Sequence, residues 1–186
     1  MNLATILEKI PFDKNLILNV YYYGSHLWGY ATTDSDVDLI VVIKNRTKNS
    51  NFKQCLHVDK FDMQIYDEDE FTQALTTCKF FPVLTQFYSK CKIQEKRIFK
   101  LDKKMVNLKK SICDEINRDI IFADKLYKKM QIEKATKTLR HSIRMANIAV
   151  QIMKNEEITI CSQDELLKLN YEKAIEKLKQ ILGKFL

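Results

Sequence analysis

The sequence predicts an α/β (α+β) fold, in which a small mixed β-sheet with flanking helices is followed by a C-terminal helical bundle. The first observation is the run LIVVI at residues 39–43, which is apolar on both faces and typical of a central, buried strand. The second is a change of period, because apolar residues after residue 67 recur at helical rather than strand spacing. No linker rich in Gly, Pro or Ser separates the halves. We therefore expect two tightly packed domains, residues 1–95 and residues 96–186.

The first half is expected to begin with a helix and to continue with three strands. Leu3, Ile6, Leu7 and Ile10 have helical spacing, and Pro11 ends that helix. The strands are segments rich in branched and aromatic residues, and a polar loop at residues 45–54 separates the second from the third. They are predicted in LILNVYYYGS (residues 16–25), where Gly24 stops the strand, at residues 36–44 and at residues 57–66.

Helical periodicity dominates the remainder of the chain. A short helix is expected at residues 69–78, and Pro82 is expected to begin another that runs to about Lys90. Ser162 offers N-cap chemistry to the last helix, and Gly183 lies near its end. The three longer helices are predicted at residues 102–130, 133–154 and 163–184.

Composition excludes several classes of protein. The chain has 186 residues of which 46% are hydrophobic, enough for a core and too many for wholesale disorder. It has no run of 18 apolar residues, so no transmembrane helix is expected. The five cysteines form no C-x-x-C pair, which argues against a disulfide framework and a zinc site. The first residues do not resemble a signal peptide, so we expect a cytoplasmic protein without membrane association.

The net charge of +7 is unevenly distributed. Residues 101–186 carry 18 of the 31 Lys and Arg and 12 of the 24 Asp and Glu, so almost all of the excess lies there. Such a half can attract phosphate-rich partners such as RNA. A Lys-rich composition can equally reflect a biased genome, and charge alone does not choose between the two.

Glycine placement marks a special turn. The chain has only three glycines, and Gly24 and Gly29 both lie between the first two predicted strands. A chain so poor in glycine is expected to use it where the backbone geometry demands it. The backbone N–H groups at Gly24 and Ser25 can there cradle a phosphate.

Three carboxylates are expected beside this turn. Asp36 and Asp38 are two residues apart, so on a strand they point to the same side. Two such carboxylates repel each other unless a cation lies between them, and Mg²⁺ prefers oxygen ligands. Asp62 on the third strand can approach the same point. Three acids beside a phosphate cradle indicate two-metal phosphoryl transfer. Asp34 is expected in the entering turn, and Asp59 is expected on the face opposite Asp62.

This stretch resembles the signature of the polymerase-beta-type nucleotidyltransferase superfamily. The pattern G-S-x-x-x-G-x-A-x-x-x-S-D-x-D-L is matched at Gly24, Ser25, Gly29, Ala31, Ser35, Asp36, Asp38 and Leu39. The segment FDMQIYDEDEFTQAL is similar to the corresponding part of bacterial minimal nucleotidyltransferases. FFPVLTQFYSK resembles the NP-x-x-L-E-x-L helix of a subgroup found near RNA-repair enzymes, with Phe81 in place of Asn and Gln86 in place of Glu.

The resemblance implies the nucleotidyltransferase fold and a metal-dependent transfer of an NMP from an NTP to an acceptor hydroxyl. It makes Asp36, Asp38 and Asp62 the ligands of two Mg²⁺ ions, with Mn²⁺ as an alternative, and makes Asp62 a candidate general base. Nucleotide-binding positions are Gly24, Ser25, His26 and Ser35. For His26, a structural role is equally compatible with the sequence.

A cationic stripe is expected on the helix at residues 133–154, where Lys137, Arg140, His141 and Arg144 fall at i, i+3, i+4 and i+7. We predict that Arg140 and Arg144 bind the nucleotide. The alternative is a solvated face opposite Leu139 and Ile143.

An RNA or tRNA end is the expected acceptor because of the basic second half. A protein or a small molecule, as in toxin-neutralising or antibiotic-modifying relatives, is an alternative acceptor. A catalytically silent nucleotide- or RNA-binding module is an alternative of another class. We also expect that a protein partner could complete the site of so compact a chain.

Overall fold

The computed structural model describes residues 3–44, 55–101 and 106–183. They form two compact units, a sheet unit (residues 1–76 and 81–102) and a helical unit (residues 77–80 and 103–186). The predicted fold class, a mixed α/β arrangement followed by helices, is confirmed. The loop predicted at residues 45–54 lies outside the described residues.

Among the described residues of the sheet unit, five strands form one sheet in the order β3-β4-β2-β1-β5. The central strand β2 is parallel to β4 and antiparallel to β1, so the sheet is mixed. The outer strands β3 and β5 run antiparallel to their neighbours β4 and β1. The strands are β1 (Ile17–Tyr22), β2 (Val37–Ile43), β3 (Cys55–Val58), β4 (Phe61–Asp67) and β5 (Lys92–Glu95).

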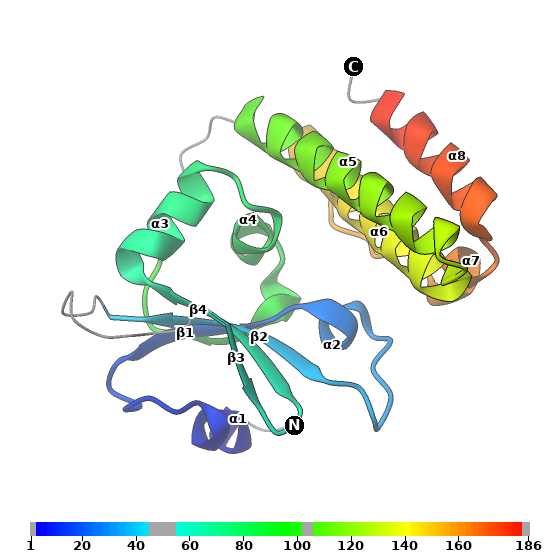
Figure 1. Ribbon diagram of the computed structural model, residues 1–186. Helices are drawn as coiled ribbons and strands as arrows, with labels where there is room; N and C mark the ends of the chain where they lie inside the picture. Colours follow the sequence, from blue (N-terminus) through cyan, green and yellow to red (C-terminus); the bar gives the residue numbers. More distant parts are fainter. Residues whose placement is uncertain (1–2, 45–54, 102–105, 184–186) are drawn as a thin grey trace. The chain divides into compact units, whose positions relative to one another are not determined.

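Helices cover the two faces of this sheet (Figure 1). On one face, Ile6 and Ile10 pack against alternate residues of β2 and β4, such as Leu39 and Met63. On the other face, the ring of Phe71 stacks on Tyr21 at a centroid distance of 6.0 Å. The LIVVI run is buried along its whole length because it has helices on both sides. The helices of this unit are α1 (Leu3–Lys9), α2 (Gly24–Trp28), α3 (Glu68–Thr76), α4 (Phe80–Phe87) and the 3₁₀ turn η1 (Ser89–Cys91).

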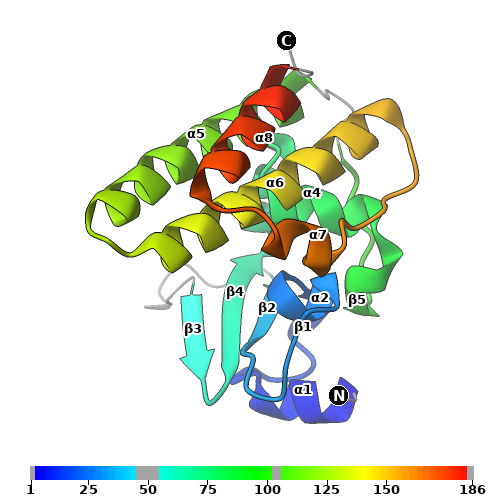
Figure 2. The same ribbon diagram turned by 90° about the vertical axis from the view of Figure 1, so that its right-hand side faces the viewer.

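The third predicted strand is in fact a β-hairpin, which Figure 2 shows as β3 and β4 beside β2. Val58 pairs with Phe61, so Asp59 and Lys60 form a two-residue turn. Asp59 adopts a φ of 53°, which an aspartate tolerates better than most residues. The prediction of one continuous strand over residues 57–66 was therefore wrong. β5 was missed altogether.

The helical unit is built on an antiparallel pair, α5 (Val106–Lys128) and α6 (Ile132–Lys154). Its core includes Ile112 of α5 with Leu139 and Ile143 of α6, each 0% exposed. The last predicted helix is two helices, α7 (Gln163–Leu167) and α8 (Tyr171–Gly183). Asn170 Oδ1 accepts a hydrogen bond from Lys173 N at 3.0 Å and so caps the N-terminus of α8. The Ser162 cap of α7 is confirmed by its 3.2 Å bond from Glu165 N.

None of the described helices combines the length and the apolar character needed to cross a membrane.

Candidate active site

A glycine-bounded helix, α2, connects the end of β1 to the segment that enters β2. Gly24 begins α2 with φ +62°, and Gly29 ends it with φ +73°. Both values lie in the left-handed region that glycine adopts without strain. A Cβ at position 24 would also overlap the carboxylate of Asp38. Gly24 is therefore required twice, for its backbone conformation and for the close approach of an acidic side chain.

Four side chains form a row across the sheet at this end of the strands, which we call the acid row. Asp38 on β2 pairs in register with Asp62 on β4, and Asp62 pairs with His57 on β3. Tyr23, just after β1, donates its backbone N–H to the carbonyl of Asp38 at 3.0 Å. Residues directly opposite on neighbouring strands place their side chains on the same face of a sheet. The order across the face is thus His57, Asp62, Asp38 and Tyr23.

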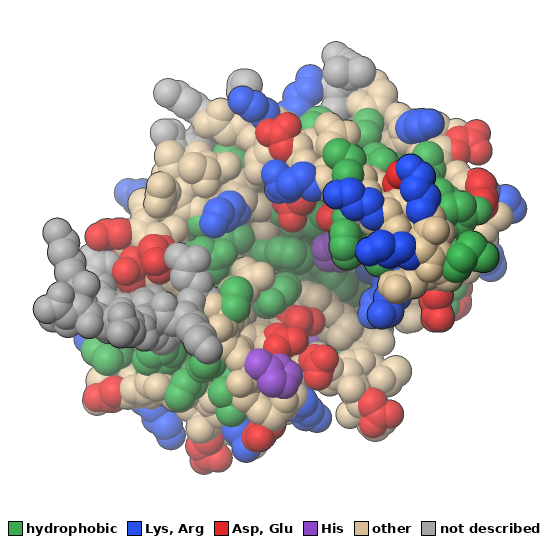
Figure 3. All heavy atoms as spheres, viewed as in Figure 1, with side chains coloured by type: hydrophobic (Ala, Val, Ile, Leu, Met, Phe, Trp, Pro, Cys, Tyr) green, Lys and Arg blue, Asp and Glu red, His purple; other side chains and the backbone are tan. Residues whose placement is uncertain are grey.

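The carboxylates of the acid row shift the pKa values of the residues at its two ends, His57 and Tyr23. His57 Nδ1 and Asp62 Oδ1 are 2.5 Å apart. This hydrogen bond raises the pKa of His57, and the charges of Asp62 and Asp36 act in the same direction. Burial raises the pKa of Tyr23, and the negative charges of Asp38 and Asp62 raise it further. In the space-filling view, acidic and histidine side chains gather together on the surface of the sheet unit (Figure 3).

Asp36 lies just before β2, not within it, and is exposed. The turn that leads to it is closed by Ser35, whose Oγ accepts a 2.9 Å hydrogen bond from Thr32 N. Asp34 lies in this turn, as expected. Asp59 lies in the β3–β4 turn and forms an ion pair with Lys9 at 2.6 Å, on the side of the hairpin that faces α1.

His26, within α2, stacks on Tyr22 with ring centroids 6.0 Å apart. Its Nε2 atom is buried and has no hydrogen-bond partner among the described residues. The indole Nε1 of Trp28 is in the same situation. Phe81 packs against both Trp28 and Tyr23, with centroid distances of 6.3 and 5.0 Å. An aromatic group thus borders the acid row on the β1 side.

The chain matches the model of the nucleotidyltransferase domain over residues 3–139, which is most of its length. It belongs to the nucleotidyltransferase domain family. Its structure is similar to that of a nucleotidyltransferase-like protein from Exiguobacterium sibiricum, with a TM-score of 0.40 and 12% sequence identity. That similarity covers 98% of this chain and 72% of the other. No protein with curated annotation is significantly similar in sequence.

The nucleotidyltransferase domain assembles the predicted site residues unevenly. Gly24, Asp38 and Asp62 come together, and Asp36 is close enough for its charge to act on His57. Within the described part of the chain, no three His, Cys, Asp or Glu side chains are grouped tightly enough to enclose a metal ion. Metal ligation by Asp36, Asp38 and Asp62 therefore stays a prediction.

In the helical unit, Arg140 has a structural contact. Its Nη2 atom donates to the carbonyl of Leu167, the last residue of α7, at 3.0 Å and to that of Leu169, just beyond the helix, at 2.6 Å. Burial lowers the pKa of His141. The stripe is therefore not a uniformly solvated face, since only Lys137 of its four residues is exposed. The roles of Arg140 and Arg144 in nucleotide binding stay predictions.

Sequence reasoning missed two members of the acid row, His57 and Tyr23. The signal for His57 was available, because a turn at Asp59 and Lys60 places residues 57 and 62 opposite each other. Without the turn, an odd spacing of five residues puts them on opposite faces of one strand. Tyr23 carries no comparable signal, because its neighbours Tyr21 and Tyr22 are chemically identical to it.

Proposed function

We propose that this chain transfers an NMP from an NTP to the hydroxyl group of an RNA end, such as that of a tRNA, and releases pyrophosphate. The observation that carries the proposal is the register pair Asp38 and Asp62 beside Gly24. The pair brings two carboxylates together on one face of neighbouring strands, next to a turn that excludes any side chain at position 24. This supports the use of the acids in catalysis rather than in folding.

The chemistry of the donor set fits divalent cations. Carboxylate oxygens are the ligands that Mg²⁺ and Mn²⁺ take, and Asp38 and Asp62 present them from adjacent strands. Asp36, Asp38 and Asp62 would hold two such ions. When bound, the ions would supply positive charge to the phosphate oxygens and to the attacking hydroxyl.

The protein's own groups have separate tasks in this proposal. The turn at Gly24 and Ser25 orients the terminal phosphates, and Ser35 and His26 line the same nucleotide. The buried Nε2 atom of His26, which has no partner in the described residues, supports such a contact. The acceptor oxygen attacks the α-phosphorus while the bond to pyrophosphate breaks, and Asp62 takes the proton of the hydroxyl.

The helical half is proposed to supply positively charged side chains. We assign catalysis to residues 1–95 and the holding of phosphate-rich substrates to residues 96–186, with Arg140 and Arg144 binding the nucleotide. The excess of positive charge in residues 101–186 supports an RNA acceptor, because affinity for RNA comes largely from neutralised phosphates. None of the five cysteines, all of which lie in the described residues, forms a disulfide. This is in keeping with a cytoplasmic enzyme, and a protein partner remains part of the proposal.

The test is incubation of the purified chain with each α-³²P-labelled NTP, Mg²⁺ and total tRNA, followed by a denaturing gel. We expect label in RNA with one preferred base, and no label with Asp36→Ala plus Asp38→Ala. Label on a protein or a small molecule in place of RNA would overturn the assignment of RNA as the acceptor, while the proposed nucleotidyl transfer would stand. Unchanged labelling by the double variant would overturn the assignment of the acids.

A further inference from the structure

The hydrogen bond between His57 and Asp62 is not explained by the stability of the fold. The two side chains are 61% and 44% exposed, and β3 is an edge strand of the described sheet. Exposed ion pairs contribute little to stability, because water competes for both partners. A short contact in such a place, directed at one of the acids of the acid row, calls for another purpose.

The hairpin holds His57 in a defined position. His57 is the register partner of Asp62, only one pair away from the two-residue turn. The register of the hairpin therefore sets the backbone position beneath the imidazole, which is what a residue needs in order to orient another side chain.

The direction of the hydrogen bond follows from its chemistry. An ionised carboxylate only accepts hydrogen bonds, so Nδ1 of His57 donates to Oδ1 of Asp62. That bond fixes the torsion of the carboxylate and occupies one of the two lone pairs of Oδ1. The second oxygen, Oδ2, is left to coordinate a cation on the same face as Asp38.

We propose that His57 is a positioning residue for the acid row, which orients the carboxylate of Asp62 so that Oδ2 can serve as a ligand of a divalent cation. This inference rests on the proposed function, because it requires the acids to bind a cation. The partners that orient metal ligands typically contribute about 10- to 100-fold in metal affinity or activity. A loss of that size is expected when His57 no longer donates.

The test uses Tb³⁺ as the probe, added to the full-length chain without nucleotide. Tb³⁺ takes oxygen ligands, and its emission is sensitised by nearby aromatic rings. Tyr23 is such a ring, since the charges of Asp38 and Asp62 act on it. Two substitutions form a matched pair. In His57→Asn the amide nitrogen replaces Nδ1, two bonds from Cβ, whereas in His57→Gln it lies one bond further away.

We expect His57→Ala and His57→Gln to weaken Tb³⁺ binding by about 10-fold or more, and His57→Asn to restore it to within about 3-fold of the parent protein. The Mg²⁺ concentration for half-maximal transfer should rise by the same factors. Circular dichroism and urea unfolding should be unchanged in all three, because the side chain is exposed on an edge strand.

Two outcomes overturn the proposal in different ways. If Asp36→Ala plus Asp38→Ala binds Tb³⁺ as tightly as the parent protein, the acids do not form a cation site and the proposed function fails with it. If that double variant loses Tb³⁺ while His57→Ala and His57→Gln bind normally, the proposed function stands and the role of His57 is wrong.

Discussion

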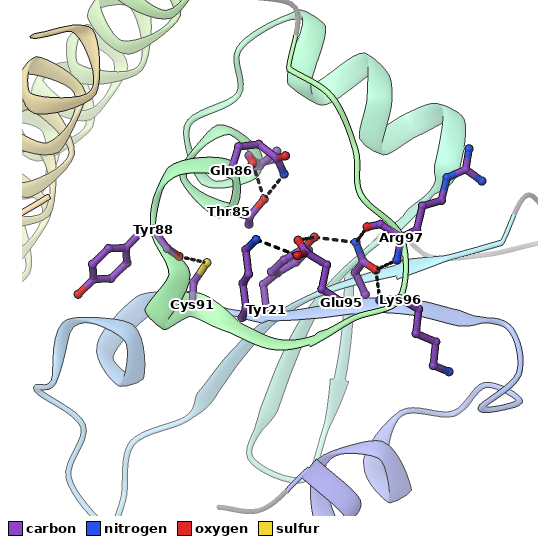
Figure 4. A network of polar contacts seen from close by, with 11 residues as sticks. Tyr21, Thr85, Gln86, Tyr88, Cys91, Glu95, Lys96 and Arg97 are labelled. Carbon is purple, nitrogen blue, oxygen red and sulfur yellow. Dashed lines mark hydrogen bonds and ion pairs between the residues drawn. The ribbon is translucent and has the colours of Figure 1, made fainter. Parts of the chain in front are cut away.

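Two groups of polar side chains in the sheet unit show opposite uses of the same chemistry. One is a buried network at the β1–β5 edge, centred on Asn19 and Tyr21 and shown in part in Figure 4. The other is the acid row at the start of β2 and β4. Both contain a tyrosine beside a carboxylate, but their surroundings differ.

The buried network is closed. Asn19 is 0% exposed, and its Nδ2 atom donates to the Tyr21 hydroxyl and to the Arg97 carbonyl, both at 2.7 Å. Its Oδ1 atom accepts from the backbone N–H groups of Lys96 and Arg97, both at 3.0 Å. Glu95, which accepts from Tyr21, is neutralised by Lys92 at 2.8 Å. Every polar side-chain atom of Asn19 therefore has a partner within the protein.

The acid row is more exposed to solvent, since the side chains of His57 and Asp62 are 61% and 44% exposed. It brings Asp38, Asp62 and the nearby Asp36 toward one region, and the side chain that contacts Asp62 is a histidine. Carboxylates gathered in this way repel one another unless a cation joins them. The difference teaches how the two groups should respond to substitution: the network supports the fold, and the row supports the reaction.

The largest expected effect is on the reaction alone. Asp36→Ala plus Asp38→Ala should lower transfer by at least about 1,000-fold, equivalent to about 4 kcal/mol of transition-state stabilisation. The free energy of unfolding should stay within about 1 kcal/mol of the parent value, because repulsion among carboxylates is removed. Transfer assays and urea unfolding on the same samples measure both quantities. A large loss of stability would make the acids structural and erase the contrast.

Asn19→Ala should show the reverse pattern. The backbone N–H groups of Lys96 and Arg97 would lose the acceptor that the fully buried Asn19 side chain provides, so we expect about 3 kcal/mol of destabilisation. Transfer per folded molecule, measured well below the midpoint of thermal unfolding, should be nearly unchanged. Gln94→Ala is the matched control on β5, since the hydrogen bonds of the Gln94 side chain to β1 carbonyls are long, 3.4 and 3.5 Å. Equal destabilisation by both variants would argue against the network.

These two groups also differ in how far the sequence predicts them. Local patterns were sufficient for β2, predicted at residues 36–44 and found at Val37–Ile43, and for α6, predicted at residues 133–154 and found at Ile132–Lys154. β5 was missed because KIQE has no alternating apolar pattern. Its place depends on pairing with β1, more than 70 residues earlier, and on Asn19. Such long-range pairing leaves no local trace.

The candidate site follows the same division. The proximity of Gly24 and Asp38 could be foreseen, because both belong to one short motif between two strands. The contact of His57 with Asp62 was missed, because it depends on a turn at Asp59 and Lys60 that contains no glycine or proline and whose only local sign is the aspartate. The contact of Arg140 with the carbonyls of Leu167 and Leu169 depends on the path of the chain after α6, which periodicity does not determine.

Gly24→Ala should affect both fold and reaction, because Gly24 touches the acid row through its backbone. The left-handed φ and the overlap with Asp38 together should cost about 2 kcal/mol of stability. Displacement of the Asp38 carboxylate should also lower transfer by about 10-fold or more. Gly29→Ala is the matched control, since its φ is +73° but no atom lies within 4 Å of an added Cβ. It should cost about 1 kcal/mol and leave transfer intact. Equal losses of transfer in the two variants would contradict the proposed contact.

Tyr21→Phe should give the smallest effect and a distinctive pH dependence. In this variant Asn19 Nδ2 still donates to the Arg97 carbonyl, and Glu95 still forms its ion pair with Lys92. The free energy of unfolding near pH 8 should therefore fall by only about 1 kcal/mol. Burial, with the charge of Glu95, raises the pKa of the Tyr21 phenol well above its ordinary value of 10.0. The stabilisation provided by the Tyr21 hydroxyl is therefore complete below pH 10. It decreases above pH 10, because the tyrosine of the unfolded chain ionises there first.

Phenylalanine cannot ionise, so it escapes this loss. By pH 11 the parent protein should lose about 1.4 kcal/mol relative to Tyr21→Phe, which cancels or reverses the difference seen near pH 8. Urea unfolding of the two proteins at pH 8 and pH 11 measures the change. A difference that is independent of pH would mean that the Tyr21 phenol ionises as readily in the folded chain as in the unfolded one, and that the network is not closed to water.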